Sequence, residues 1–147
     1  MYHTIVRRKV RKLWQRVGNG DYQAAVALAA PGLHFRFAGG PPLGADLHGP
    51  DEFRRWFAGA FALLPGLRMT LTDLVVRGWP WNTTVVVRLA ISATLSDGTP
   101  YTNEAVQWVR LRWGQMTDDY VLEDTAQLAD AARRQKAAAA ARPQGSG

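Results

Sequence analysis

Residues Gly114–Leu128 read Gly-Gln-Met-Thr-Asp-Asp-Tyr-Val-Leu-Glu-Asp-Thr-Ala-Gln-Leu, and they predict the last strand of a β-rich region. The leading glycine is typical of a tight turn, because glycine adopts positive φ angles without steric cost. Side chains alternate between the two faces of a strand. One face is therefore expected to carry Met116, Asp118, Tyr120, Leu122 and Asp124.

Asp124 ends this segment, where a carboxylate among apolar neighbours needs a polar partner. Two interpretations are open. Asp124 is either a strand-end carboxylate that faces water or caps a short turn, or an acid or base at the bottom of a pocket.

The region before this strand has a period of two and predicts an antiparallel meander. We expect four strands, over residues 67–78, 82–95, 101–113 and 115–125. The turns between them are too short for crossovers, and Asp97-Gly98 is a strong hairpin signal. Strand 82–95 has apolar residues on both faces. This indicates that helices cover one face and a symmetric partner subunit covers the other.

The first half of the chain predicts helices. Residues 3–18 have apolar side chains at helical spacing and basic side chains on the other face. Asp21 is expected to cap a second helix over Tyr22–Ala30. A short strand over Leu33–Phe37 and a loop precede a third helix over residues 50–64. Helices segregated from strands indicate an α+β domain.

Composition narrows the function classes. A chain of 147 residues with 47% hydrophobic residues is long enough for one domain with a real core. The absence of cysteine excludes disulfide bonds, thiolate catalysis and cysteine-ligated zinc. The three histidines match no metal motif, so neither a metal nor another cofactor is expected. No apolar run has transmembrane length and no signal peptide is evident, so we expect a cytoplasmic protein with no membrane partner.

The net charge of +6 allows an acidic partner. The basic residues gather toward the two ends of the chain, over 7–16 and 133–136, where we expect solvated helix faces without specific nucleic-acid binding. From Ala129 the chain has no apolar stripe and predicts a fraying helix, followed by disorder over Arg142–Gly147. The expected organisation is a folded domain over residues 1–128 and a basic, alanine-rich tail over 129–147.

Several local motifs, taken in order, resemble the SnoaL-like branch of the NTF2-like superfamily. Leu47–Phe57 resembles its H-G-x-x-x-F-x-x-W/F-F/Y start of the third helix, after a strand at Phe35–Gly39. Asp97–Met116 resembles its d-G-x-x-y…r-l-r-x-G-k-i hairpin, and Glu123-Asp124-Thr125 its closing x-D-t/l strand. The resemblance covers residues 3–128 and implies an NTF2-like cone, with three N-terminal helices packed on a curved antiparallel sheet around an apolar pocket.

The resemblance also suggests a site. Asp124 follows Gly114, and Arg88 precedes Gly98, at the distances found for the catalytic Asp and Arg of limonene-type epoxide hydrolases. A carboxylate and a guanidinium inside a dry cone would neutralise each other. However, the second Asp of those enzymes is replaced by Ala90, and their Tyr and Asn on the first strand are absent. Ketosteroid isomerase fits less well, whereas polyketide cyclases use an Asp as acid and base.

Other aromatic and acidic residues are candidates for the ligand-binding wall. Trp14, Trp56 and Phe57 face inward by helical spacing, as core or as pocket wall. Glu104 and Trp108 share a strand face and line the cone only if that face is the concave one.

Three functional hypotheses follow. The first is a cofactor-independent cyclase, isomerase or epoxide-hydrolase-like enzyme that uses Asp124 as acid or base beside Arg88. The second is a non-catalytic module that binds a ligand or dimerises, with the same two residues as a buried ion pair. The third is a basic adaptor that binds a nucleic acid or another protein through its basic first helix. The expected partners are a small apolar or polycyclic ligand and a second copy of the chain in a homodimer, joined through the convex face of the meander.

Overall fold

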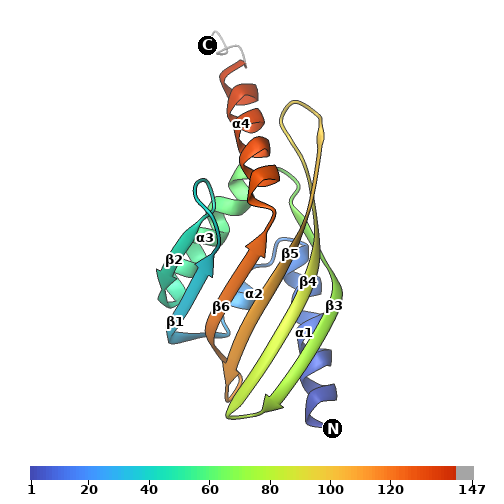
Figure 1. The fold of residues 1–147 in the computed structure, drawn as a ribbon, viewed down its shortest axis with the longest axis vertical. Coiled ribbons are helices and arrows are strands. Elements are labelled where there is room, and N and C mark those ends of the chain that lie inside the picture. Colours follow the sequence, from blue (N-terminus) through green and yellow to red (C-terminus); the bar gives the residue numbers. More distant parts are fainter. Residues whose placement is uncertain (142–147) are drawn as a thin grey trace.

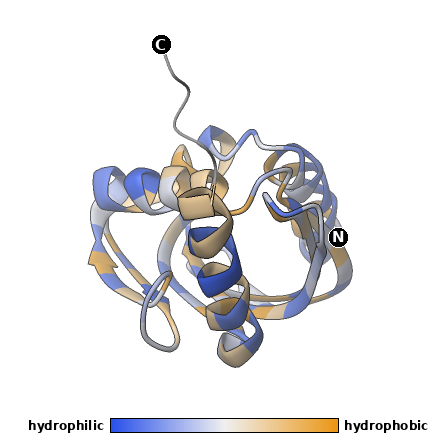
Figure 2. Ribbon diagram, turned by 90° about the horizontal axis from the view of Figure 1, so that it is seen from above, coloured by the Kyte–Doolittle hydropathy of each residue, from blue (hydrophilic) through white to orange (hydrophobic). Residues whose placement is uncertain are grey.

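A curved six-stranded sheet with helices in its hollow forms the body of the molecule (Figures 1 and 2). The computed structural model describes residues 1–141. In chain order its elements are α1 (Tyr2–Gly18), α2 (Gln23–Val26), β1 (Ala29–Phe37), β2 (Ala45–His48), α3 (Gly49–Leu63), β3 (Arg68–Trp79), β4 (Asn82–Thr94), β5 (Pro100–Arg112), β6 (Gln115–Glu123) and α4 (Thr125–Ala141). The strand order is β2-β1-β6-β5-β4-β3, and β1 and β6 run parallel while the other neighbours are antiparallel.

The α+β architecture, the helices α1 and α3 and the four-stranded meander β3–β6 are confirmed. Their periodic patterns are long, and each is buried on one side. On α1 the buried side chains are Val6, Val10, Trp14 and Val17, and on α3 they are Phe53, Phe57 and Ala60. Gly18 lets the end of α1 lie directly against β3, since a Cβ at this position would lie 2.1 Å from the Met69 carbonyl oxygen.

The predicted helix over 22–30 is wrong beyond its first turn. Only Gln23–Val26 is helical, and β1 begins at Ala29. The Met116 backbone N–H donates to the Leu28 carbonyl at 2.7 Å, and Ala29 lies opposite Met116 on β6. Pairing with a strand almost ninety residues away therefore overrides the helix preference of an alanine-rich segment. It also makes the sheet mixed rather than purely antiparallel.

Strand β2 lies where the sequence predicts a loop. It is only four residues long and pairs with β1 from Phe37 opposite Ala45 to His34 opposite His48. A segment this short shows too little alternation to be distinguished from a loop.

A β-bulge in β6 decides which of its side chains face the hollow. Arg110 lies opposite Asp118, but the next residue of β5, Leu111, lies opposite Met116. Thr117 is thus an extra residue, and an extra residue exchanges the two faces of everything beyond it. Met116, Asp119 and Val121 are buried inside the hollow, whereas Leu122 is exposed on the outer face. The expectation that Met116, Asp118, Tyr120, Leu122 and Asp124 share one face is therefore wrong.

Helix α4 packs over the end of the meander. Leu128 and Ala131 are buried, Gln135 hydrogen-bonds the Ser96 backbone and hydroxyl, and Arg134 donates to the Thr99 hydroxyl at 3.0 Å. The expected disorder of 142–147 lies outside the described residues, and the domain boundary at 128 stays a prediction. Within residues 1–141, no helix combines the length and the apolar character needed to cross a membrane.

Candidate functional site

Two small apolar cavities lie in the hollow between the sheet and the helices, which we call the cone. The first, of about 60 Å³, lies between α1, α3 and the meander, and the second, of about 50 Å³, lies between α3, β1 and the meander. Phe57 and Gln107 border both cavities. Each cavity has one acidic residue in its wall, Asp119 in the first and Glu123 in the second.

Asp119 is a carboxylate without any solvent exposure. It has 0% relative exposure, and its Oδ1 accepts a hydrogen bond from Gln107 Nε2 at 2.7 Å. Its Oδ2 is equally buried and accepts no hydrogen bond from any residue between 1 and 141. Burial, with a smaller contribution from the neighbouring Asp118 charge, raises the pKa of Asp119 to about 7 despite the opposing Gln107 hydrogen bond. A carboxyl group with a pKa near neutrality is suited to both accepting and donating a proton.

Glu123 is the second acidic group on the inner face of β6. The Tyr101 hydroxyl donates to its Oε1 at 2.9 Å, and Asn103 Nδ2 donates to the Tyr101 oxygen at 2.7 Å. Burial raises the pKa of Glu123 to about 7, against the lowering effect of its hydrogen bonds to Tyr101 and Asn103. Burial is also the main cause of the raised pKa of Tyr101, which keeps this hydroxyl protonated as a donor.

The two carboxyl groups act at separate points rather than as a pair. Four residues of strand separate their Cα atoms by about 13 Å. Gln107 lies between them, because it is the cross-strand partner of Val121. The arrangement thus offers a proton-exchanging group in each cavity, with an amide donor in between.

The predicted Asp124–Arg88 ion pair is wrong. Asp124 follows the last residue of β6 and is exposed, and its Oδ1 accepts the backbone N–H groups of Ala126 and Gln127 at 3.1 and 3.2 Å. It caps the start of α4, which is the other interpretation that the sequence left open. Arg88 Nη2 donates to Glu104 Oε1 at 2.8 Å, with 57% and 67% of the two side chains exposed.

Two of the valines near Arg88 in the sequence, Val85 and Val87, lie on the opposite face of β4. On its own face Arg88 lies opposite Val106, which is exposed. Its strand neighbours Val87 and Leu89 point into the cone, so Arg88 points outward. Glu104 and Trp108 lie on the same outer face, and Trp108 is 46% exposed. These two residues therefore do not line the cone.

Trp14, Trp56 and Phe57 lie at the cone. Trp14 borders the first cavity, Trp56 the second and Phe57 both. Trp56 Nε1 also donates to the Leu43 carbonyl at 2.9 Å, which fixes the indole beneath the β1–β2 hairpin. Their contact with a ligand stays a prediction.

The residues predicted from the sequence did not include Tyr101, Asn103, Gln107, Asp119 and Glu123. One signal was present. Asn103 and Gln107 alternate with Tyr101, Ala105 and Val109 on β5, and two amides on an otherwise apolar strand face are typical of a polar site in a core. Which of Asp118 and Asp119 faces the cone could not be predicted, because it depends on the bulge at Thr117, which the sequence does not reveal.

A wide groove adjoins the first cavity from outside. It has a volume of about 680 Å³ and runs between α1 and the β5–β6 turn, where Ile5, Leu28 and Trp113 are exposed. Val10, Leu13, Leu28 and Leu111 border both the groove and the cavity. These side chains separate the groove from the cavity that contains Asp119.

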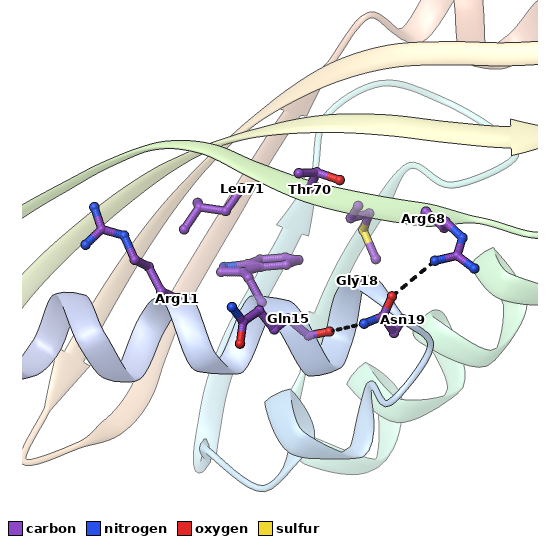
Figure 3. Close-up of a pocket in the computed structure, with 9 residues that line it drawn as sticks. Arg11, Gln15, Gly18, Asn19, Arg68, Thr70 and Leu71 are labelled. Atoms are coloured by element: carbon purple, nitrogen blue, oxygen red, sulfur yellow. Dashed lines mark hydrogen bonds between the residues drawn. The ribbon is translucent and has the colours of Figure 1, made fainter.

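A second cleft, of about 360 Å³, lies between α1 and β3 (Figure 3). Its rim is polar, since Arg68 Nη1 donates to Asn19 Oδ1 at 3.3 Å and Asn19 Nδ2 donates to the Gln15 carbonyl at 2.8 Å. Trp14 borders both this cleft and the first cavity, and its indole separates the two.

Comparison with known proteins assigns the family. The statistical model of the SnoaL-like domain matches residues 10–119, which is well over half of the chain. The chain belongs to the SnoaL-like family. No curated protein matches the sequence significantly.

Solved structures agree with the cone fold. TerC, co-crystallised with polyporic acid, has a TM-score of 0.73 at 18% identity, over 87% of this chain and 97% of TerC. An NTF2-like protein of unknown function from Burkholderia pseudomallei has a TM-score of 0.72 at 20% identity, over 84% and 94% of the two chains. IdmH from Streptomyces antibioticus, a candidate polyketide cyclase, has a TM-score of 0.65 at 18% identity, over 81% and 91%. At these identities the likeness shows the fold, and it confirms the NTF2-like cone.

Proposed function

We propose that this SnoaL-like protein binds a small, largely apolar molecule in the cone and moves a proton on it with Asp119. The observation that supports this proposal most strongly is that Asp119, which borders an apolar cavity, has a buried Oδ2 atom without a hydrogen-bond partner among residues 1–141. A buried oxygen without a partner lowers stability, and a ligand that donates a hydrogen bond to it would offset this cost. TerC, which has a similar fold, was co-crystallised with polyporic acid, and this supports the proposal that the present protein also binds a small molecule.

The chemistry that fits these groups is cofactor-independent acid–base catalysis on a carbonyl compound. Ionised Asp119 would accept a proton from the carbon next to the carbonyl, and the electron pair would move to the carbonyl oxygen. Gln107 borders the same cavity and donates to Asp119 Oδ1, and its second amide N–H would donate a hydrogen bond to the ligand's carbonyl oxygen. Glu123 lies in the other cavity and would contact a more distant part of the ligand. Return of the proton to another carbon gives an isomerase. Attack of the carbon on a second carbonyl forms a carbon–carbon bond and an alkoxide, and transfer of the proton from Asp119 to this alkoxide completes a cyclase reaction.

The cavities are too small for this task as they stand. Ligand pockets usually enclose about 300–1,000 Å³. Phe57 divides the two cavities, and Val10 and Leu13 separate the first from the outer groove. We therefore infer that a ligand enters along α1 and displaces these side chains, which joins groove and cavities into one pocket.

A panel of apolar ketones and diketones in D2O tests the proposal. Loss of the α-proton NMR signals should be faster with the protein than without it, and roughly a hundredfold slower with Asp119→Asn, as general-base catalysis contributes about 10²–10⁴-fold. Asp118→Asn is the matched control, because Asp118 faces outward and pairs with Arg36. Binding of a ketone without any exchange would instead favour the non-catalytic, ligand-binding alternative.

A further inference from the structure

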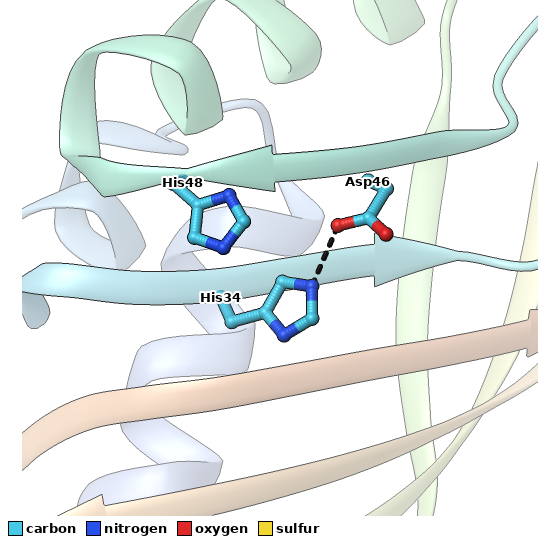
Figure 4. A group of neighbouring side chains, drawn as sticks. All are labelled: His34, Asp46 and His48. Atoms are coloured by element: carbon cyan, nitrogen blue, oxygen red, sulfur yellow. Dashed lines mark hydrogen bonds and ion pairs between the residues drawn. The ribbon is translucent and has the colours of Figure 1, made fainter.

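The outer face of the β1–β2 edge carries a compact group of His34, Asp46 and His48 (Figure 4). One potential ligand atom from each side chain lies within 4.8 Å of the other two. The two imidazole rings stack with centroids 4.6 Å apart and an angle of 6° between their planes, and His34 Nε2 lies 2.6 Å from Asp46 Oδ1. Two of the three histidines in the chain are thus in one place, and neither is in the cone.

The backbone holds these three side chains together. His34 and His48 are direct cross-strand partners, and Asp46 lies two residues before His48 on the same strand face. His48 is also the N-cap residue of α3, and its backbone N–H donates to Glu52 Oε2 at 2.7 Å. Strand pairing and helix capping therefore fix all three Cα positions, while the side chains keep freedom to rotate.

Asp46 forms no ion pair with the nearby Arg36, so its carboxylate is available to bind a ligand. Arg36 is its cross-strand partner, but the Arg36 guanidinium lies over the Tyr120 ring at 4.7 Å and beside Asp118 Oδ1 at 3.4 Å. Asp46 consequently interacts with His34 rather than with this arginine.

We propose that His34, Asp46 and His48 bind one divalent transition-metal ion, with Zn²⁺ as the best match. Two imidazole nitrogens and one carboxylate oxygen are a common zinc donor set, and an exposed site leaves water for the fourth position. Donors around tetrahedral zinc lie about 3.3 Å apart, from metal–ligand distances of about 2.0–2.1 Å. Rotation of the two imidazole rings out of their parallel stack, together with rotation of the exposed Asp46 side chain, would bring the donor atoms to this spacing around one ion.

This site was invisible in the sequence because its ligands come from two strands. The bound ion would connect the short edge strand β2 to β1 and to the start of α3. Its effect would be to stabilise that edge, since a ligand that binds only the folded state raises stability by mass action.

The test uses the full chain without an affinity tag, stripped with a chelator and titrated with Zn²⁺ by calorimetry. We expect one ion per chain, and roughly tenfold or greater loss of affinity in His34→Gln, His48→Gln and Asp46→Asn. His3→Gln is the matched control, because His3 lies on α1 and hydrogen-bonds the Gly78 carbonyl instead. Its affinity should equal that of the wild type.

A Co²⁺ titration gives a second readout that does not depend on any variant folding. Visible absorption bands of tetrahedral strength, which saturate at one equivalent, are expected for the wild-type protein. No saturable binding of Zn²⁺ or Co²⁺, or undiminished Zn²⁺ affinity in the folded double variant His34→Gln/His48→Gln, would overturn the proposal.

Discussion

A carboxyl group enclosed as completely as Asp119 makes the stability of the fold depend on pH. Its pKa is about 7 in the folded chain, against an ordinary value of 3.8. Below the ordinary value the group is protonated in both states. Between the two values the folded state holds a proton that the unfolded state has released, so unfolding becomes easier as pH rises.

The free energy of unfolding should therefore fall between about pH 4 and pH 7, with a slope of at most about 1.4 kcal/mol per pH unit for each such carboxyl group. Glu123 contributes in the same direction. Chemical denaturation at several pH values measures the slope. Asp119→Asn, which can keep the Gln107 hydrogen bond, should flatten it. Asp118→Asn removes only the smaller contribution of its charge and should change the slope much less. Equal slopes in the wild type and Asp119→Asn would contradict a raised pKa at this position.

At the scale of the elements, long periodic segments were predictable and short or irregular ones were not. Helices α1 and α3 and strands β4 and β5 each bury one face, and their residue patterns show this directly. By contrast, β1 begins within an alanine-rich segment because it pairs with distant β6, and the pairing has no local signal. The candidate site was misassigned for a related reason, since the bulge at Thr117 exchanges the faces of β6 and brings Asp119 and Glu123 inside in place of Asp124.

The role of Asp124 as the cap of α4 gives an element-scale prediction. Asp124→Ala should lower the free energy of unfolding by about 1 kcal/mol, which is typical for loss of an N-cap. Asp130→Ala on the same helix, whose carboxylate forms exposed pairs with Arg133 and Arg134, should cost less. Urea denaturation measures both changes.

The same experiment separates the cap from a buried ion pair. Arg88 and Asp124 have different partners, so the effects of Arg88→Met and Asp124→Ala should be additive. A loss of about 3–5 kcal/mol for Asp124→Ala, partly recovered in the double variant, is the behaviour of a buried pair and would contradict the cap assignment.

At the scale of the whole molecule, the outer face of the meander is a candidate surface for a second copy. Val75, Val106, Trp108 and Leu122 are all exposed there, and contiguous apolar surface of this kind marks interaction sites. Cross-strand pairing joins them, since Val106 lies opposite Leu122 and Val86 connects Val75 to Trp108. The sequence-based expectation of a homodimer thus stays a prediction with a defined surface.

Light scattering at micromolar concentration should give twice the mass of the 147-residue chain, and Trp108→Glu should give the monomer mass. Trp79→Glu is the matched control, because Trp79 is exposed in the β3–β4 turn region at one end of the sheet rather than within the patch. It should leave the mass unchanged. A monomer mass for the wild-type protein would contradict the prediction that the outer face is a dimer interface.

The acid–base chemistry proposed for the cone requires that its acidic groups exchange protons near neutral pH. Carbon-13 NMR of the side-chain carboxyl groups, assigned with Asp119→Asn and Glu123→Gln, measures it directly. We predict titration midpoints of about 7 for both Asp119 and Glu123. Midpoints below about 5 for both, close to the ordinary values of these side chains, would contradict the burial described here and the acid–base chemistry proposed from it.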